Sequence, residues 1–159
     1  AMQYIAIQDY YADPLAVCYG CGRLNEHGLQ IKSYWDGDET ICVFRPLPQH
    51  TAIKGFVYGG LIASLIDCHG TGTAAAALYR AAGVAMDDPQ TVFRCVTASL
   101  HVDYLAPTPL GVDLTLRARA VEVKARKVVV ECELSARGKV AATGRVVAVN
   151  VPEGFGQSE

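Results

Sequence analysis

Residues 56–77 read FVYGGLIASLIDCHGTGTAAAA, and this stretch decides the fold of the chain. It predicts a long apolar helix from about Gly60 to Ala82, opened by a pair of glycines. Apolar residues recur in it at three- and four-residue spacing, which indicates one aliphatic face for packing against a sheet. The residues of that face are Leu61, Ile62, Leu65, Ile66 and His69. We expect His69 to be a core or interface histidine and not a catalytic partner, because it points about 200° around the helix from Asp67.

A carboxylate, Asp67, lies two turns inside this helix. Burying an unpaired carboxylate is costly, so we expect it to have a chemical task. The N–H groups of Gly59 and Gly60 stand at the positive end of the helix, where they can hold an oxyanion. Together these features predict attack on a carbonyl group. The alternative, in which Asp67 caps a loop or pairs with a core cation, stays open.

The opposite side of the helix carries small or polar residues, which let a backbone or a ligand approach closely. They are Gly60, Ala63, Ser64, Asp67, Gly70, Thr71 and Ala74. Asp67 follows Gly60 by seven residues, so a rise of 1.5 Å per residue separates them by about 10 Å. A carbonyl about 3 Å from its oxyanion donors therefore lies too far from the carboxylate of the same helix. We expect a homodimer with shared sites, in which antiparallel helices bring each Asp67 near the partner's glycine pair.

The composition describes one compact domain over residues 1–159, with residues 1–16 as an N-terminal arm or short helix. Hydrophobic residues make up 51% of the 159 residues and charged residues 19%. The net charge of −2 gives no basic surface for nucleic acid or an anionic membrane. We also expect no membrane span and no signal peptide, and hence a cytoplasmic protein, because uninterrupted apolar runs and a basic N-terminal segment are missing from the sequence.

Strand patterns surround the helix and predict an α+β fold, with an antiparallel sheet of about five to six strands around one long helix. The turn sequence Asp36-Gly37-Asp38 predicts a hairpin between the first two strands. In the fourth strand the apolar phase flips after Ala120, which predicts a bulge or a strong bend. The predicted strands are residues 28–35, 39–46, 92–105, 112–124, 128–134 and 139–151.

The six cysteines are scattered, as in a reduced protein with cysteines in its core. Two of them form a CxxC motif, Cys18-Tyr19-Gly20-Cys21-Gly22. A structural zinc ion needs further ligands, and the sequence has no second CxxC or HxxxH pair. We therefore expect a turn of small residues here and no metal.

The order of elements and the motifs resemble the hotdog fold, and more specifically the PaaI-like acyl-CoA thioesterases. That group carries His-Gly-Gly at the helix start and an Asp nine residues after the His. This chain has Tyr58-Gly59-Gly60 and Asp67 at that spacing. Two flanking stretches also match, the CxxC motif with Asn25 and Gly28-Leu29, and residues 102–109. The resemblance extends from about residue 15 to residue 151.

The resemblance implies hydrolysis of an acyl-CoA thioester, with Asp67 as general base or nucleophile. The N–H group of Gly59 or Gly60 would polarise the thioester carbonyl, and the pantetheine arm would enter along the subunit interface. His50 would line the site, where relatives often have a polar residue. No cofactor is implied, since coenzyme A is part of the substrate. We expect a medium-chain or aryl acyl group, and a homodimer that pairs into a dimer of dimers.

Several side chains are candidates for binding the substrate. Tyr58 replaces the usual His, and a phenol with a reference pKa of about 10 donates a hydrogen bond but is no base near neutral pH. Ser64 lies on the small-residue side of the helix near Asp67. Lys124, Arg126 and Lys127 form a cationic hairpin tip, which is either a solvated turn or a clamp for the phosphates of coenzyme A.

Two other functions stay open. A hotdog hydratase or dehydratase needs an Asp/His or His/Glu pair at the helix, and the sequence shows none. A non-catalytic acyl-CoA binding protein is compatible with Tyr58 in place of His. His101 and Asp103 lie on one face of a predicted strand and form either an ion pair or part of an acyl pocket.

Overall fold

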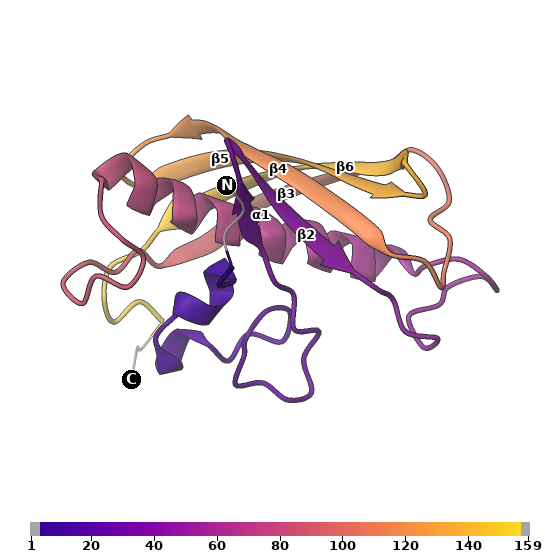
Figure 1. The fold of residues 1–159 in the computed structure, drawn as a ribbon, viewed down its shortest axis with the longest axis horizontal. Coiled ribbons are helices and arrows are strands. Elements are labelled where there is room, and N and C mark those ends of the chain that lie inside the picture. Colours follow the sequence, from indigo (N-terminus) through magenta and orange to yellow (C-terminus); the bar gives the residue numbers. More distant parts are fainter. Residues whose placement is uncertain (1–3, 157–159) are drawn as a thin grey trace.

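The computed structural model describes residues 4–156 and shows a six-stranded sheet curved around one long helix (Figure 1). The sheet order is β1-β2-β4-β5-β6-β3, and every neighbouring pair is antiparallel. This confirms the predicted α+β architecture. The elements are two 3₁₀ turns at Ile7–Tyr10 and Asp13–Leu15, β1 Tyr34–Asp36, β2 Glu39–Phe44, α1 Gly59–Ala82, β3 Cys95–Tyr104, β4 Leu114–Val123, β5 Lys127–Ala136 and β6 Lys139–Asn150.

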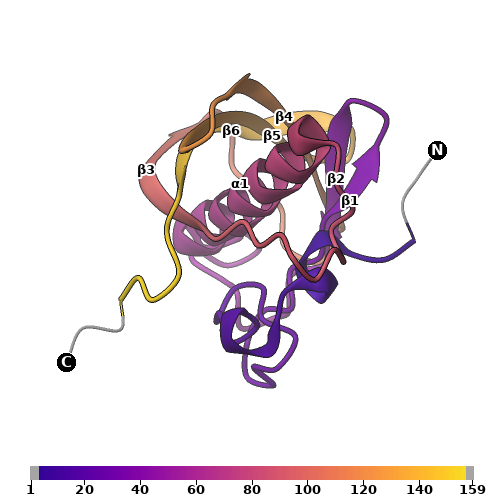
Figure 2. The ribbon, with the colours of Figure 1, turned by 90° about the vertical axis from the view of Figure 1, so that its left-hand side faces the viewer.

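Helix α1 lies between two layers. The sheet arches over one side of it, and the N-terminal turns with the following loop lie on the other side (Figure 2). The predicted aliphatic face is buried throughout, from Leu61 to Ile66. The helix is long and apolar enough to span a bilayer, but 78% of its apolar window is buried inside the domain. It therefore acts as the core helix of this fold, as the sequence predicted.

The two ends of α1 are built differently. At its C-terminus, Gly83 adopts a left-handed conformation with φ of 69°, and the N–H groups of Gly83 and Val84 return to the carbonyls of Arg80 and Tyr79. At its N-terminus, within residues 4–156, no side chain caps the helix. The first N–H groups of a helix have no partner within the helix itself. The N–H groups at the glycine end of α1 can therefore donate hydrogen bonds to a ligand.

The structure confirms the predicted place of His69 in the core. It is fully buried between the sheet and the N-terminal segment, where its Nδ1 lies 2.8 Å from Ser33 Oγ and its Nε2 lies 3.2 Å from Thr40 Oγ1. Burial lowers the pKa of His69 to about 4, so the ring is neutral at pH 7. The network continues from Thr40 to Thr73 and from Ser33 to Gln8. These polar groups satisfy one another and hold the N-terminal segment to the helix.

The first predicted strand is shorter than expected. Residues 28–33 do not pair in the sheet, and β1 begins only at Tyr34. Gln30 has a φ of 56°, which no regular strand allows, and Leu29 and Ile31 donate instead to the carbonyls of Tyr19 and Gly20. This segment therefore belongs to the loop that carries the CxxC motif.

Two predicted irregularities of the sheet are confirmed. Asp36 pairs with Glu39 across a two-residue turn whose Gly37 has a φ of 65°. In the β4–β5 ladder, the register shifts between Ala120 and Glu122, where the apolar phase of the sequence changes. These local signals determined the shape of the sheet.

The predicted small-residue side of α1 is only partly correct. Gly70 lies under the sheet, where a Cβ atom would come 2.5 Å from Val146 Cγ2, and Ala74 is fully buried. Their small size therefore serves close packing of helix on sheet. Ala63, Ser64, Asp67 and Thr71 remain partly exposed, as a free face of the helix requires.

Candidate active site

Strand β3 forms one edge of the sheet and is exposed over most of its length. A bulge at residues 97–99 shifts its register against β6. Beyond it, His101 and Asp103 point to the outer face of the sheet, while Val102 and Tyr104 point toward the helix side. Without the bulge, Thr97 would share the outer face with His101, because strand side chains alternate. The bulge turns Thr97 toward α1.

Within residues 4–156, one side chain donates a hydrogen bond to the Asp67 carboxylate. The hydroxyl group of Thr97 donates to Asp67 Oδ1 at 2.5 Å. The carboxylate is partly buried, so the expectation of an unpaired buried charge is wrong in that respect. Because Thr97 occupies one oxygen, the other remains available for a reacting group. The sequence reasoning did not find Thr97, since its inward direction depends on the bulge.

The glycine pair meets the other end of the same strand. Tyr104 donates its phenolic hydrogen to the carbonyl of Gly59 at 2.7 Å. The ring of Tyr58 folds across Gly60, and a Cβ atom at residue 60 would overlap that ring. Glycine at position 60 therefore lets the Tyr58 ring lie directly against the backbone. The backbone of the glycine pair stays accessible between two phenols.

Hydrogen bonds to the backbone fix His50 and Ser64 near this end of the helix. His50 Nδ1 accepts the N–H of Leu47 at 2.9 Å, and the carbonyl of His50 accepts the N–H of Tyr58 at 3.0 Å. In a neutral ring, the hydrogen then lies on Nε2. Ser64 donates to the carbonyl of Gly60 at 2.8 Å, so only its lone pairs remain for a ligand. Both residues therefore support the loop and first turn that carry the glycines.

A cavity of about 380 Å³ opens beside Gly59. Its wall is mostly apolar and comes from the loop before α1, from α1 and from the end of β3 with the residues after it. Thr108 in this wall is 3% exposed, and its hydroxyl has no hydrogen-bond partner among residues 4–156. The lining residues are Phe56, Val57, Gly59, Ile62, Tyr104, Leu105, Ala106, Pro107 and Thr108. This cavity can hold an apolar group next to one unpaired hydroxyl.

The predicted cationic tip lies at the other end of the sheet from Gly59. Lys124 and Lys127 both pair with Glu122, at 3.3 Å and 3.2 Å, and together they hold the pKa of that carboxyl below its ordinary value. Arg126 makes no ion pair within the described chain. Lys127, Val149 and Val96 face one another across three strands. Two strand spacings place the tip about 10 Å from Val96, which precedes Thr97. The tip therefore lies toward the Asp67 end of β3.

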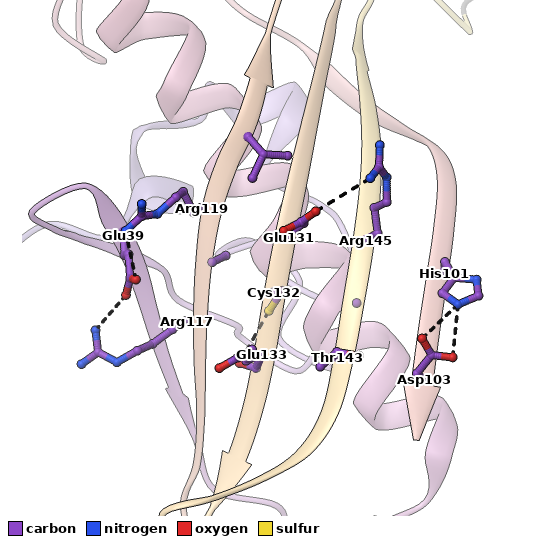
Figure 3. A pocket seen from close by; sticks show the side chains of 13 residues that line it. Glu39, His101, Asp103, Arg117, Arg119, Glu131, Cys132, Glu133, Thr143 and Arg145 are labelled. Carbon is purple, nitrogen blue, oxygen red and sulfur yellow. Dashed lines mark hydrogen bonds and ion pairs between the residues drawn. The ribbon is translucent and has the colours of Figure 1, made fainter. Parts of the chain in front are cut away.

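A second cavity lies on the outer face of the sheet (Figure 3). Its volume is about 550 Å³, and several of the charged side chains that line it form ion pairs. The pairs are Arg117 with Asp36 and Glu39, Arg119 with Glu39, Arg145 with Glu131, and His101 with Asp103. His101 and Asp103 thus contact each other at 3.2 Å, as in the first of the two arrangements that the sequence left open. We do not assign the chemistry to this face, because it holds neither Asp67 nor the helix N-terminus.

In the structure a third cysteine, Cys68, lies beside the two cysteines of the CxxC motif. The Sγ atoms of Cys18, Cys21 and Cys68 all lie within 4.8 Å of one another, and all three are free thiols. Hydrogen bonds from the other two thiols and from the N–H groups of Cys21 and Gly20 lower the pKa of Cys18. Cys68 follows Asp67 directly on α1. Sequence spacing could not reveal this cluster, because Cys68 lies 47 residues after Cys21.

Comparison with known proteins shows the family of the chain. The model of the thioesterase superfamily matches residues 54–143, which is more than half of the chain. The chain belongs to the thioesterase superfamily. A thioesterase superfamily protein from Shewanella loihica PV-4 is 50% identical, with a TM-score of 0.68, and the match covers 91% of this chain and 99% of that one. The predicted family resemblance and hotdog fold are therefore confirmed.

Two further relatives narrow the comparison. Acyl-coenzyme A thioesterase THEM4 of Xenopus laevis is 34% identical over 94 residues, which are 59% of this chain and 36% of that protein. The chain thus spans only about a third of the length of that relative. The PaaI protein of the E. coli phenylacetic acid degradation operon is 17% identical, with a TM-score of 0.63 and coverage of 78% and 81%. That last likeness concerns the fold alone.

Proposed function

We propose that the protein is an acyl-CoA thioesterase, active as a homodimer in the cytoplasm, with two sites shared between its subunits. Membership of the thioesterase superfamily and the similarity to an acyl-coenzyme A thioesterase support the reaction class. The main observation in favour of a shared site is that β3 contacts both halves of the proposed catalytic machinery. This one exposed edge strand contacts Asp67 through Thr97 and Gly59 through Tyr104.

The exposed edge of β3 is the surface on which we propose that the two subunits pair. An edge strand offers unpaired backbone groups to a second strand. If β3 pairs antiparallel with its own copy so that Thr97 faces the partner's Tyr104, each Asp67 comes beside the partner's Gly59. The side-chain contacts support this arrangement, because Thr97 contacts Asp67 and Tyr104 contacts Gly59 of the same chain. One two-fold operation thus brings both halves of each site together.

The chemistry follows from the two halves. The thioester carbonyl oxygen accepts the N–H groups of the glycine pair, which stabilise the negative charge that develops in the transition state. The free oxygen of Asp67 either takes a proton from the attacking water or attacks the carbonyl carbon itself. In the first route the C–S bond of the tetrahedral intermediate breaks, and Asp67 passes the proton to the sulfur of coenzyme A, which leaves together with the acid product. In the second route coenzyme A leaves as a thiolate that takes a proton from water, and a water molecule then hydrolyses the mixed anhydride on Asp67 to release the acid. Thr97 keeps the carboxylate oriented through the reaction.

The cavity and the cationic tip bind the two ends of the substrate. The apolar cavity beside Gly59 suits a medium-chain or aryl acyl group, and its volume lies in the range of small-ligand sites. Lys124, Arg126 and Lys127 bind phosphates of coenzyme A, with Arg126 contributing a guanidinium that no carboxylate neutralises.

A thiol-release assay with a panel of acyl-CoA substrates tests the proposed function. We expect release of one coenzyme A thiol per acid formed, with the highest kcat/KM for medium-chain or aryl substrates. Saturable binding of acyl-CoA without thiol release would instead establish a binding protein. Consumption of an enoyl-CoA without thiol release would identify a hydratase.

The cationic tip supplies a separate prediction. Replacing Lys124, Arg126 and Lys127 together with Ala should raise KM for acyl-CoA about three- to tenfold and leave kcat nearly unchanged, since remote phosphate contacts are equal in the ground and transition states. Steady-state kinetics on a short thioester without the nucleotide provide the control, and we expect no change there. An equal loss on both substrates would show that the hairpin has a structural role only.

A further inference from the structure

Three thiols from two distant parts of the chain meet at one point. Cys18 and Cys21 lie on one turn of the N-terminal loop, and Cys68 lies on α1. Cys18 Sγ is 3.9 Å from Cys68 Sγ, and all three sulfur atoms lie within 4.8 Å of one another. The remaining cysteines, Cys42, Cys95 and Cys132, are not members of this cluster. The cluster is therefore a specific local feature and not a general property of the core.

The spacing of the sulfur atoms fits a metal ion. Four ligands at about 2.3 Å around tetrahedral zinc are separated from one another by about 3.8 Å. A disulfide requires its two sulfurs to lie about 2.05 Å apart, much closer than these thiols. The three sulfurs therefore already approximate one face of a zinc tetrahedron. Cys18 is exposed, so the cluster lies at the protein surface, where water can fill the fourth position.

The loop is built so that its thiols reach the helix. Gly20 has no side chain because a Cβ atom there would overlap Cys68 Sγ. At Gly22, a Cβ atom would come 2.5 Å from the backbone nitrogen of Cys18, and the N–H of Gly22 donates to the carbonyl of Cys18 at 2.8 Å. The N–H of Ile31 fixes the carbonyl of Gly20 at 3.0 Å. The CxxCG turn is thus held in one shape before any ion binds.

We propose that Cys18, Cys21 and Cys68 bind a zinc ion, which fastens the N-terminal loop to α1 one residue beyond Asp67. Thiolates are soft ligands, and a tetrahedral set of sulfurs favours zinc among common divalent ions. Zinc binds the thiolate form, so the protons of the three thiols are released to solvent when the ion binds. The expectation of no metal rested on the sequence spacing of possible ligands, and Cys68 supplies the ligand that the spacing did not show.

The direct test is zinc binding to the reduced, metal-free protein. Competition against a chromophoric chelator should give one zinc ion per chain, and zinc should protect three of the six thiols from a thiol reagent. Cys18→Ser, Cys21→Ser and Cys68→Ser should each weaken binding at least about a hundredfold. Cys95→Ser, a partly buried cysteine outside the cluster, is the matched control and should bind zinc like the unaltered protein.

Cobalt substitution provides a readout that does not depend on affinity. The unaltered protein and Cys95→Ser should show thiolate-to-cobalt charge-transfer bands and tetrahedral ligand-field bands, and Cys68→Ser should lose them. Circular dichroism shows whether each variant is folded. If Cys68→Ser unfolds, Cys18→Ser replaces it in the cobalt experiment, because Cys18 is exposed and its substitution disturbs the core less. Zinc binding no tighter than in the cluster variants would overturn the proposal. Equal loss in Cys95→Ser, or a disulfide within the cluster in place of zinc binding, would also overturn it.

Discussion

Asp67 and His69 lie two residues apart on the same helix, and their surroundings differ in every respect. His69 is fully buried and neutral, and both of its ring nitrogens have hydroxyl partners. Asp67 is partly exposed, and one hydroxyl group contacts it beside an open sheet edge. A closed polar network stabilises one fold, whereas an open carboxylate leaves an acceptor for a reactant. The comparison distinguishes a structural polar residue from the proposed catalytic one.

The largest expected effect falls on activity at Asp67. Asp67→Asn should lower kcat for thioester hydrolysis by about a hundredfold to ten-thousandfold, because a positioned acid–base group contributes that much. The melting temperature should change little, since the side chain is partly exposed and the amide still accepts a hydrogen bond from Thr97. Thiol release and thermal unfolding measure the two quantities. Full activity in a folded Asp67→Asn protein would refute the assignment.

His69 should show the opposite pattern. His69→Ala removes the partner of two buried hydroxyl groups and leaves a cavity, so we expect a loss of about 3 kcal/mol in the free energy of unfolding. Turnover per folded molecule should stay within about threefold, because the imidazole faces away from Asp67. Denaturant unfolding and active-site-normalised kinetics check both statements. A large loss of turnover without loss of stability would place His69 in the chemistry.

Much of this contrast was predictable from the sequence, and the remainder depends on distant contacts. Helical spacing placed Asp67 and His69 on different sides of α1, and the glycine pair marked the helix start. The inward turn of Thr97 depends on a bulge in β3, where the apolar pattern gives no signal. The missing first half of the first strand follows from the backbone of Gln30 and its neighbours, which bond to the CxxC turn. Cys68 joins that turn only through tertiary packing.

Tyr58 gives a smaller effect that sharpens the role of the helix end. Its ring covers Gly60, but the N–H groups of the backbone are present with or without the phenol. Tyr58→Phe should therefore reduce kcat/KM less than tenfold, the scale of one ordinary hydrogen bond. Kinetics on the best acyl-CoA substrate measure it. A reduction beyond a hundredfold would move the phenol into the oxyanion site.

The central claim is that Asp67 of one subunit works with the glycines of the other. Asp67→Ala and Gly60→Val, each carrying a different affinity tag, should both be inactive as homodimers, since one lacks the carboxylate and the other blocks the N–H groups. In the heterodimer, one site collects both changes and the other is intact. Thiol release by the isolated heterodimer should therefore recover about half of the unaltered activity per dimer. No recovery in a correctly assembled heterodimer would contradict the claim and place each site within a single chain.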